Sequence, residues 1–405
     1  MSLQTLTSNL NLRDTKTLLA LAALPPAAYY LISSIRQLTT HNKPPTPRIH
    51  RSPLSDPEPT TTAPYPPNAL PGARDIPTPH GSIRAYEWGP ASGRKVLFVH
   101  GISTPCVALA GLAQALVQQQ GCRVLLFDLF GRGYSDCPPT AQDSALWASQ
   151  IAFVLGSSEL EWWGEGFVVV GYSLGGGIAA DWASWFPRTV RGLVLVAPAG
   201  LLRAGRVAWW SRFVYGGFLP RGLVERIVGR RLRGGSGGRQ PEETKVGVVQ
   251  SAEAEVPGKG EEEAIGGGGR GGGLFPGRPV FSVADVVDWQ VDAHPGFVPA
   301  FISSIQNSPI SGQQERWRLV GSRLDRQRLN PDDDVAAKQG MTEGKVLLML
   351  GKDDSIIVAD EIGPDAEEVL GKENVEVRVL DGGHDLPVAN ADGCAKAIGD
   401  FWDSI

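Results

Sequence analysis

The most constraining feature of this sequence is an apolar run that leads into a glycine-rich turn around one serine. Residues 168–170 are all valine and predict a buried strand, because β-branched side chains favour extended backbone. The next residues follow the pattern Gly-x-Ser-x-Gly, and Ile178–Phe186 predicts a helix that Pro187 ends. In this context the turn would present the Ser173 hydroxyl at the carboxyl end of a strand, with the Leu174 N–H aimed at the same point.

Strands and helices alternate along the rest of the chain. Further strands are expected at Ser82–Trp88, Lys95–Val99, Arg123–Phe127, Val190–Val196, Lys345–Leu350 and Val375–Leu380. Helices are expected at Val107–Gln118, Trp147–Leu155 and Ala395–Trp402. This alternation predicts an α/β fold with a mostly parallel central sheet that helices flank on both faces. A chain of 405 residues can hold one such domain with an insertion and a separate N-terminal piece.

Three motifs follow three of these strands in chain order. They are His-Gly at 100–101, Asp-x-x-Gly-x-Gly-x-Ser at 128–135 and Gly-Tyr-Ser-Leu-Gly-Gly at 171–176. With them the chain from about Arg84 to Trp402, less an insertion, resembles the α/β-hydrolase superfamily. The resemblance implies an α/β-hydrolase fold with a helical cap, and a serine hydrolase with a Ser-Asp-His triad.

The resemblance also implies an oxyanion hole made of two backbone N–H groups, those of Ile102 and Leu174. Two such donors matter because negative charge develops on the carbonyl oxygen during acyl transfer, and losing one donor costs ~3 kcal/mol. His100 is expected to be a buried structural histidine that holds this loop. Asp128 and Arg132 are expected to order their own loop rather than to act in catalysis.

The C-terminal third supplies a base for Ser173. Of six histidines, only His100 and His384 follow predicted strands, which leaves His384 for this role. A histidine is suited to it near neutral pH because its ordinary pKa is ~6.5. A serine hydroxyl is a weak nucleophile until such a base takes its proton, and the expected product is an acyl-enzyme that water then hydrolyses.

The acid of the triad is expected in the loop after Lys345–Leu350. Superfamily members commonly carry Gly-x-x-Asp there, which selects Asp354 to hold the imidazole in the correct tautomer. Asp353 is the alternative, while Asp381 and Asp385 flank the base and are expected to order its loop.

Residues 201–343 separate the two parts of the predicted hydrolase core, 81–200 and 344–405, and resemble the helical cap of the superfamily. Helical stretches are expected at Leu201–Arg233, Val283–Ile305 and Gln314–Leu324. Within the cap, residues 234–277 are rich in glycine and glutamate and are expected to form a disordered loop. Aromatic residues of the first stretch either pack the cap on the core or line an apolar acyl-binding pocket. They are Trp209, Trp210, Phe213, Tyr215 and Phe218.

The N-terminal residues 1–36 are predicted to form a membrane anchor. Leu18–Ile35 carries no charge and approaches the ~20 residues that span a bilayer, although Pro25-Pro26 would kink such a helix. A cleaved secretory signal peptide is the alternative. Basic residues are more numerous after this segment than before it and favour a cytoplasmic catalytic domain. Residues 37–80, rich in proline and threonine, are predicted to be a linker without a core of its own.

The composition and the serine nucleophile exclude several classes of function. A net charge of −5 gives no basic field for nucleic acid, and four scattered cysteines have no metal-binding or redox spacing, so no cofactor or metal is expected. Serine at 173 argues against epoxide hydrolases and haloalkane dehalogenases, relatives that use an aspartate nucleophile. The prediction is a hydrolase of an apolar, lipid-like carboxylic ester. An acyltransferase, a C–C bond hydrolase, a perhydrolase and a non-catalytic binding protein stay open, as does the oligomeric state.

Overall fold

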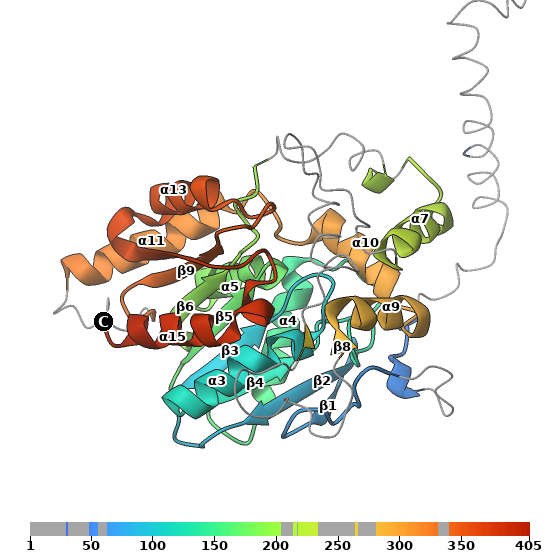
Figure 1. The fold of residues 1–405 in the computed structure, drawn as a ribbon, viewed down its shortest axis with the longest axis horizontal. Coiled ribbons are helices and arrows are strands. Elements are labelled where there is room, and N and C mark those ends of the chain that lie inside the picture. Colours follow the sequence, from blue (N-terminus) through green and yellow to red (C-terminus); the bar gives the residue numbers. More distant parts are fainter. Residues whose placement is uncertain are drawn as a thin grey trace, which may run out of the picture. The chain divides into compact units, whose positions relative to one another are not determined.

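The computed structural model describes residues 48–55, 63–203, 214–216, 218–233, 264–265, 281–330 and 340–405, together with Tyr30. The chain divides into two compact units, Met1–Arg48 and Ile49–Ile405, and the architecture below is that of the second unit (Figure 1). A twisted sheet lies at its centre, with helices on both faces of the sheet.

The central sheet has eight strands in the order β1-β2-β4-β3-β5-β6-β9-β10. The strands are β1 (Arg74–Thr78), β2 (Gly81–Trp88), β3 (Lys95–Val99), β4 (Arg123–Phe127), β5 (Phe167–Tyr172), β6 (Val190–Val196), β9 (Val346–Gly351) and β10 (Val375–Leu380). The pairings of β1 with β2 and of β2 with β4 are antiparallel, and the other five are parallel. The predicted α/β fold with a mostly parallel sheet is therefore confirmed.

The inner strands lie at the centre of the sheet because they are apolar along nearly their whole length. Every residue of β3, β5 and β9 is buried, and these strands are almost continuous runs of Val, Leu and Phe. Such runs are typical of parallel strands that helices cover on both faces. β10 lies at the edge, and only its first residue, Val375, is fully buried.

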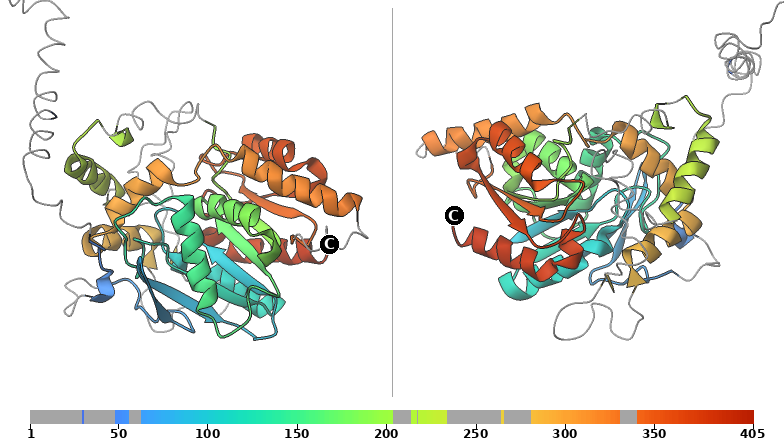
Figure 2. Two further views of the ribbon diagram at one scale, coloured as in Figure 1. Left: turned by 180° about the vertical axis from the view of Figure 1, so that it is seen from behind. Right: turned by 45° about the horizontal axis from the view of Figure 1, so that its top comes forward.

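Helices cover the two faces of the sheet in separate groups (Figure 2). On one face α3 (Ala110–Gln120) packs against α15 (Ala391–Trp402). On the other, α4 (Ser144–Gly156), α5 (Leu174–Trp185), α11 (Gln314–Leu329) and α13 (Ala359–Leu370) lie in a row. Short helices connect these elements: η1 (Pro53–Ser55), η2 (Cys106–Leu109), η3 (Pro187–Thr189), η5 (Lys372–Asn374) and α14 (Leu386–Ala389).

The cap contains α7 (Arg221–Arg233), α9 (Val283–Ala293) and α10 (Phe297–Asn307), which pack against one another. The strands β7 (Ala264–Ile265) and β8 (Phe281–Ser282) pair before α9. Ser282 begins α9 with a capping box, because its hydroxyl accepts from the Asp285 N–H and the Asp285 carboxylate accepts from the Ser282 N–H. The rest of the expected disordered loop, 234–263 and 266–277, lies outside the described residues.

One helix that we expected in the cap, α11, belongs to the core. It packs against α5 and α13, with Trp317, Val320 and Leu324 buried. The approach to α13 is close at Gly321, where an added Cβ would lie 2.1 Å from the Leu370 carbonyl oxygen. The prediction was wrong here because the apolar spacing of a helix does not say which neighbour covers it.

Part of the expected linker, 37–80, is also integrated into the core. It includes β1, the strand at the opposite edge of the sheet from β10, and the backbone of His50 forms a bridge with Cys137. The carboxylate of Asp136 then accepts from the Arg51 guanidinium at 2.8 Å and from the Ser52 N–H at 2.7 Å. Prolines and threonines thus did not prevent order, because a buried carboxylate of the core supplies acceptors for this segment.

The predicted membrane anchor, Leu18–Ile35, lies outside the described residues except for Tyr30. Among the residues that the structure describes, no helix is both long and apolar enough to cross a bilayer. The anchor stays a prediction from the sequence.

The four cysteines are free and buried. Burial raises the pKa of Cys122 and Cys137 to about 11 and that of Cys394 to about 12. The pKa of Cys106 is also raised, by burial and by the nearby Asp128.

Candidate active site

Ser173 occupies a strained turn between β5 and α5. Its backbone has φ 50° and ψ −119°, a region that side chains other than glycine rarely adopt. The turn is held on both sides, because the Ser173 N–H donates to the Val196 carbonyl while the Ser173 carbonyl accepts from the Gly176 and Ala199 N–H groups. Strain fixed in this way fits a nucleophile elbow, in which a serine stands at the tip of a strand–turn–helix motif.

The two motif glycines allow the turn to be this tight. A Cβ on Gly171 would lie 2.4 Å from the carbonyl oxygen of Gly175, and a Cβ on Gly175 would lie 2.0 Å from that of Val99. Both distances fall inside van der Waals contact, so larger residues would push α5 away from β3 and β5. The Gly-x-Ser-x-Gly spacing thus brings the start of α5 against the end of β3.

The three side chains that the sequence predicted as a triad lie in one hydrogen-bonded chain. His384 Nε2 is 3.0 Å from Ser173 Oγ, and His384 Nδ1 is 2.8 Å from Asp354 Oδ2. An ionised carboxylate only accepts, so Nδ1 carries the proton and Nε2 is left to accept from the serine hydroxyl. All three residues are buried, with 7%, 5% and 7% of Ser173, Asp354 and His384 exposed. The residues come from the carboxyl ends of β5, β9 and β10.

Asp354 is held as an ionised acceptor. Its other oxygen, Oδ1, accepts from the Ile356 and Ile357 N–H groups, each at 2.8 Å. Burial acts to raise the pKa of this carboxyl, but His384 and the two N–H groups together lower the pKa below its ordinary value. A carboxylate fixed by two backbone donors can orient the imidazole and stabilise its charged form.

The competing carboxylates are placed differently. Asp353 is exposed, although it is adjacent to Asp354 in the loop after β9. Asp381 is also exposed, and its carbonyl accepts from the Asn390 side chain. Asp385 stands at the start of α14, where its carbonyl accepts from the Val388 and Ala389 N–H groups. Of the four candidate carboxylates, it is Asp354 that forms the hydrogen bond with His384 Nδ1 described above.

The first predicted oxyanion donor, Ile102, lies in the loop after β3, and the start of this loop packs against Gly175 of the elbow. His100 is fully buried, its Nδ1 lies 2.8 Å from the Gly101 carbonyl, and its Nε2 accepts from the Leu129 N–H. These contacts agree with the expected structural role of His100. The second predicted donor, Leu174, is the first residue of α5, and the first N–H groups of a helix have no partner within the helix.

Asp128 and Arg132 hold the neighbouring loops, as expected. The Asp128 carboxylate accepts from the Cys106 and Tyr134 N–H groups, each at 2.9 Å, and burial raises its pKa. Arg132 is fully buried and donates to the Ile102 and Phe130 carbonyls, each at 3.0 Å.

Two residues that the sequence did not single out also contact this region. The ring of Tyr172, within the motif, lies 5.6 Å from that of His384. Gln290 of α9 is fully buried and bonds to the loops after β3 and β4. No motif signals Gln290, since a lone glutamine in an amphipathic helix has no distinctive spacing.

The predicted acyl-pocket aromatics are only partly described. Trp209, Trp210 and Phe213 lie outside the described residues, Tyr215 is buried, and Phe218 is 69% exposed. Phe218 is therefore not part of a closed pocket wall. In the described part of the chain, no cluster of His, Cys, Asp or Glu is arranged to hold a metal ion.

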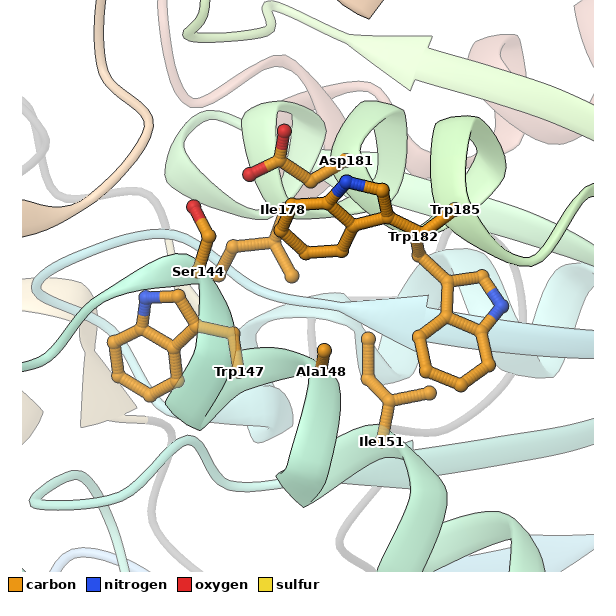
Figure 3. A pocket seen from close by; sticks show the side chains of 8 residues that line it. All are labelled: Ser144, Trp147, Ala148, Ile151, Ile178, Asp181, Trp182 and Trp185. Atoms are coloured by element: carbon orange, nitrogen blue, oxygen red, sulfur yellow. The ribbon is translucent and has the colours of Figure 1, made fainter.

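A small crevice lies between α4 and α5 (Figure 3). Its walls are Ser144, Trp147, Ala148, Ile151, Ile178, Asp181, Trp182 and Trp185, none of them a triad residue. Burial raises the pKa of Asp181, and Arg316 lies 3.8 Å from this carboxylate. The indoles of Trp147 and Trp182 donate to Ser308 and Thr189. These hydrogen bonds join the walls of the crevice to the end of α10 and to η3.

Comparison with known proteins places this geometry in a family. The family described as alpha/beta hydrolase fold matches residues 95–390. A 2-hydroxymuconate semialdehyde hydrolase of Pseudomonas sp. (strain CF600) is 33% identical over 121 residues, which are 29% of this chain and 41% of that protein. An uncharacterized protein of Mycobacterium bovis is 33% identical over 126 residues, 31% of this chain and 35% of that protein.

A solved structure covers far more of the chain. The esterase RhEst1 from Rhodococcus sp. ECU1013 has a TM-score of 0.51 at 21% identity, covering 82% of this chain and 99% of its own. The chain thus spans about two fifths or less of the curated relatives just described, while the fold extends over almost the whole esterase. The motifs after β3, β4 and β5, the topology of the sheet and the family match agree, and the chain belongs to the α/β-hydrolase family.

Proposed function

We propose that this protein hydrolyses a carboxylic ester through an acyl-enzyme on Ser173. The observation that carries the proposal is the chain of contacts from Ser173 Oγ to His384 Nε2, at 3.0 Å, and from His384 Nδ1 to Asp354, at 2.8 Å. A serine next to a base that a third group orients is the arrangement that nucleophilic catalysis requires.

The first half of the reaction forms the acyl-enzyme. Ser173 Oγ attacks the ester carbonyl carbon while its proton moves to His384 Nε2, and Asp354 stabilises the imidazolium that results. The Ile102 and Leu174 N–H groups would donate to the oxygen that becomes negative. When the tetrahedral intermediate collapses, the alcohol leaves with the proton from Nε2.

The second half releases the acid. A water molecule gives a proton to His384 Nε2 and attacks the acyl carbon, and the Ser173 oxygen then leaves with that proton. If an alcohol or a thiol took the place of this water, the same residues would transfer the acyl group. Hydrolysis is the first choice because it needs no second substrate site.

The relative from Pseudomonas favours one further candidate. Its name is that of a 2-hydroxymuconate semialdehyde hydrolase, and the C–C bond hydrolysis we kept open from the sequence would use the same serine and histidine. We place it second, because the match covers only 29% of this chain.

The test is a set of p-nitrophenyl esters of graded acyl length, offered to the purified full chain. Ester hydrolysis predicts turnover with a preference for apolar acyl groups, and labelling of Ser173 by a fluorophosphonate. Labelling without turnover of any ester would favour C–C bond hydrolysis or acyl transfer, which a vinylogous diketone and an added alcohol then separate. Absence of both labelling and turnover would favour a non-catalytic binding protein.

We also propose that residues 1–36 hold the protein at a membrane with the catalytic domain on the cytoplasmic side. The uncharged segment Leu18–Ile35 and the basic residues after it support this proposal. The full chain should stay in the membrane fraction after alkaline carbonate extraction, whereas release, or a shortened secreted form, would favour the signal peptide.

A further inference from the structure

Three successive carbonyls in the loop after β3 each accept a hydrogen bond from a buried side chain. His100 Nδ1 lies 2.8 Å from the Gly101 oxygen, Arg132 Nε donates to the Ile102 oxygen at 3.0 Å, and Gln290 Nε2 donates to the Ser103 oxygen at 2.9 Å. Their donors are fully buried, so these bonds do not compete with bulk water. The loop is thus fixed at every carbonyl from 101 to 103.

Because peptide units are planar, holding these carbonyls also fixes the direction of the Ile102 N–H, the predicted oxyanion donor. The Gly101 carbonyl and the Ile102 N–H belong to one planar peptide unit, in which they point in opposite directions. The units on the C-terminal side are held by Arg132 and Gln290, so the Ile102 unit can tilt little in either direction. Donors matter most when they are preorganised before charge develops.

Two of the three supports depend on the cap. Gln290 lies in α9, and its Oε1 accepts from the Gly133 N–H at 2.8 Å, so one amide joins the loops after β3 and β4. Arg132 lies in the core, but its Nη2 donates to Ser304 Oγ of α10 at 2.8 Å. α9 and α10 therefore each reach the loop, α9 directly and α10 through Arg132.

We propose that Gln290 and Ser304 are positioning residues for the oxyanion hole. In this arrangement the cap holds the Ile102 N–H in the direction that the developing oxyanion needs. The inference rests on the proposed ester hydrolysis at Ser173, and it adds that part of the catalytic machinery is supported from the cap.

Neighbouring serines on α10 provide a matched test. Ser304 Oγ accepts from Arg132, whereas Ser303 Oγ accepts from the Gln142 N–H at 3.0 Å. Ser304→Ala and Ser303→Ala each remove one hydroxyl acceptor from the same helix, and Ser303 Oγ also accepts from the Asn307 side chain. Of the two, Ser304→Ala alone removes a partner of Arg132, which holds the Ile102 carbonyl in the loop after β3. Two cap glutamines extend the comparison, because Gln306 donates to the Tyr215 carbonyl instead of to this loop.

The readout is the ratio of kcat/KM for an ester to that for its thionoester. A thiocarbonyl sulfur accepts hydrogen bonds poorly, so this ratio reports on the oxyanion donors, and a loss of folded enzyme cancels from it. Ser304→Ala and Gln290→Met should lower the ratio and reduce kcat on the ester about tenfold or more, less than the ~10²–10³-fold that loss of a donor costs. KM should change little, and Ser303→Ala and Gln306→Met should keep the wild-type ratio.

An unchanged ratio in Ser304→Ala and Gln290→Met, with circular dichroism like that of the wild type, would overturn the proposal. An equal fall in all four variants would also overturn it, because the cap would then act only by its general attachment. If the wild type cleaves no ester but a fluorophosphonate labels it, the function proposed above fails. The labelling rate constants of Ser304→Ala and Ser303→Ala then decide the inference, since the phosphoryl oxygen occupies the same hole.

Discussion

The catalytic edge of the core and the cap of α7, α9 and α10 contribute to one site in different ways. At the core edge each candidate residue lies in the turn or loop that follows a strand, so the order of the strands brings Ser173, Asp354 and His384 near one another. In the cap, Gln290 and Ser304 lie inside helices and reach the core through side chains. Local sequence therefore determines the reacting groups, whereas long-range packing determines how firmly they are held.

The largest expected effect tests the core edge itself. Ser173→Ala removes the nucleophile and should lower kcat about 10⁶-fold, as the loss of a triad serine does elsewhere. Fluorophosphonate labelling, followed by mass spectrometry, should disappear with it. Ser184→Ala, on the same α5 helix, should be labelled like the wild type. Persistent labelling of Ser173→Ala would place the nucleophile in another part of the chain.

The next largest effect tests whether Asp354, and not the adjacent Asp353, is the acid of the triad. Asp354→Asn keeps the shape of the side chain but loses control of the His384 tautomer, so kcat should fall about 10⁴-fold. Asp353→Asn changes the adjacent, exposed carboxylate and should leave most of the activity. Both variants are assayed on one ester, with folding checked by circular dichroism. A dead Asp353→Asn beside an active Asp354→Asn would reverse the assignment.

A smaller effect, on the pH dependence of stability, is expected where the cap contacts the core. His294, at the end of α9, lies 2.8 Å from the Ser135 carbonyl through Nε2, and burial lowers its pKa to about 4. The unfolded chain, with a histidine pKa of ~6.5, binds more protons between these two values, so stability falls as the pH drops through this window. From pH 7 to pH 5 this histidine should remove about 2 kcal/mol of the free energy of unfolding.

Urea unfolding at the two pH values measures this effect. His294→Gln should flatten the dependence of stability on pH, although it lowers stability at pH 7. An undiminished slope in His294→Gln would assign the acid sensitivity to other groups.

The smallest effect, on the Tm, is expected for the glycine-rich part of the cap that the sequence predicts to be a disordered loop. Replacing residues 234–263 with a short Gly-Ser linker should change the Tm little, because closure entropy varies by only ~0.6 kcal/mol per doubling of loop length. The replacement stops before Ala264, which pairs with Ser282. Differential scanning calorimetry of the two forms is sufficient, and a fall of many degrees would mean that this segment packs on the cap.

The same contrast explains which features the sequence could predict. The sheet strands other than β1, the helices α3, α4, α5 and α15 and the three candidate triad residues follow from apolar runs and short motifs, because each depends on neighbours within a few residues. β1 and α13 were not predicted. The placement of α11 was not predictable, since its buried face fits a cap as well as it fits α5 and α13. The attachment of Arg51 and Ser52 to Asp136, more than 80 residues away, also has no local signal.

The buried cysteines allow local opening of this protein to be followed by the rate at which their thiols are modified. A thiol with a pKa near 11 or 12, enclosed by packed side chains, reacts with a disulfide reagent only after the surrounding structure opens. Cys137 lies against the N-terminal segment at His50, and Cys394 lies in α15 at the other end of the chain. Their separate rates of modification under native conditions would report whether the two ends of the domain open together or one at a time.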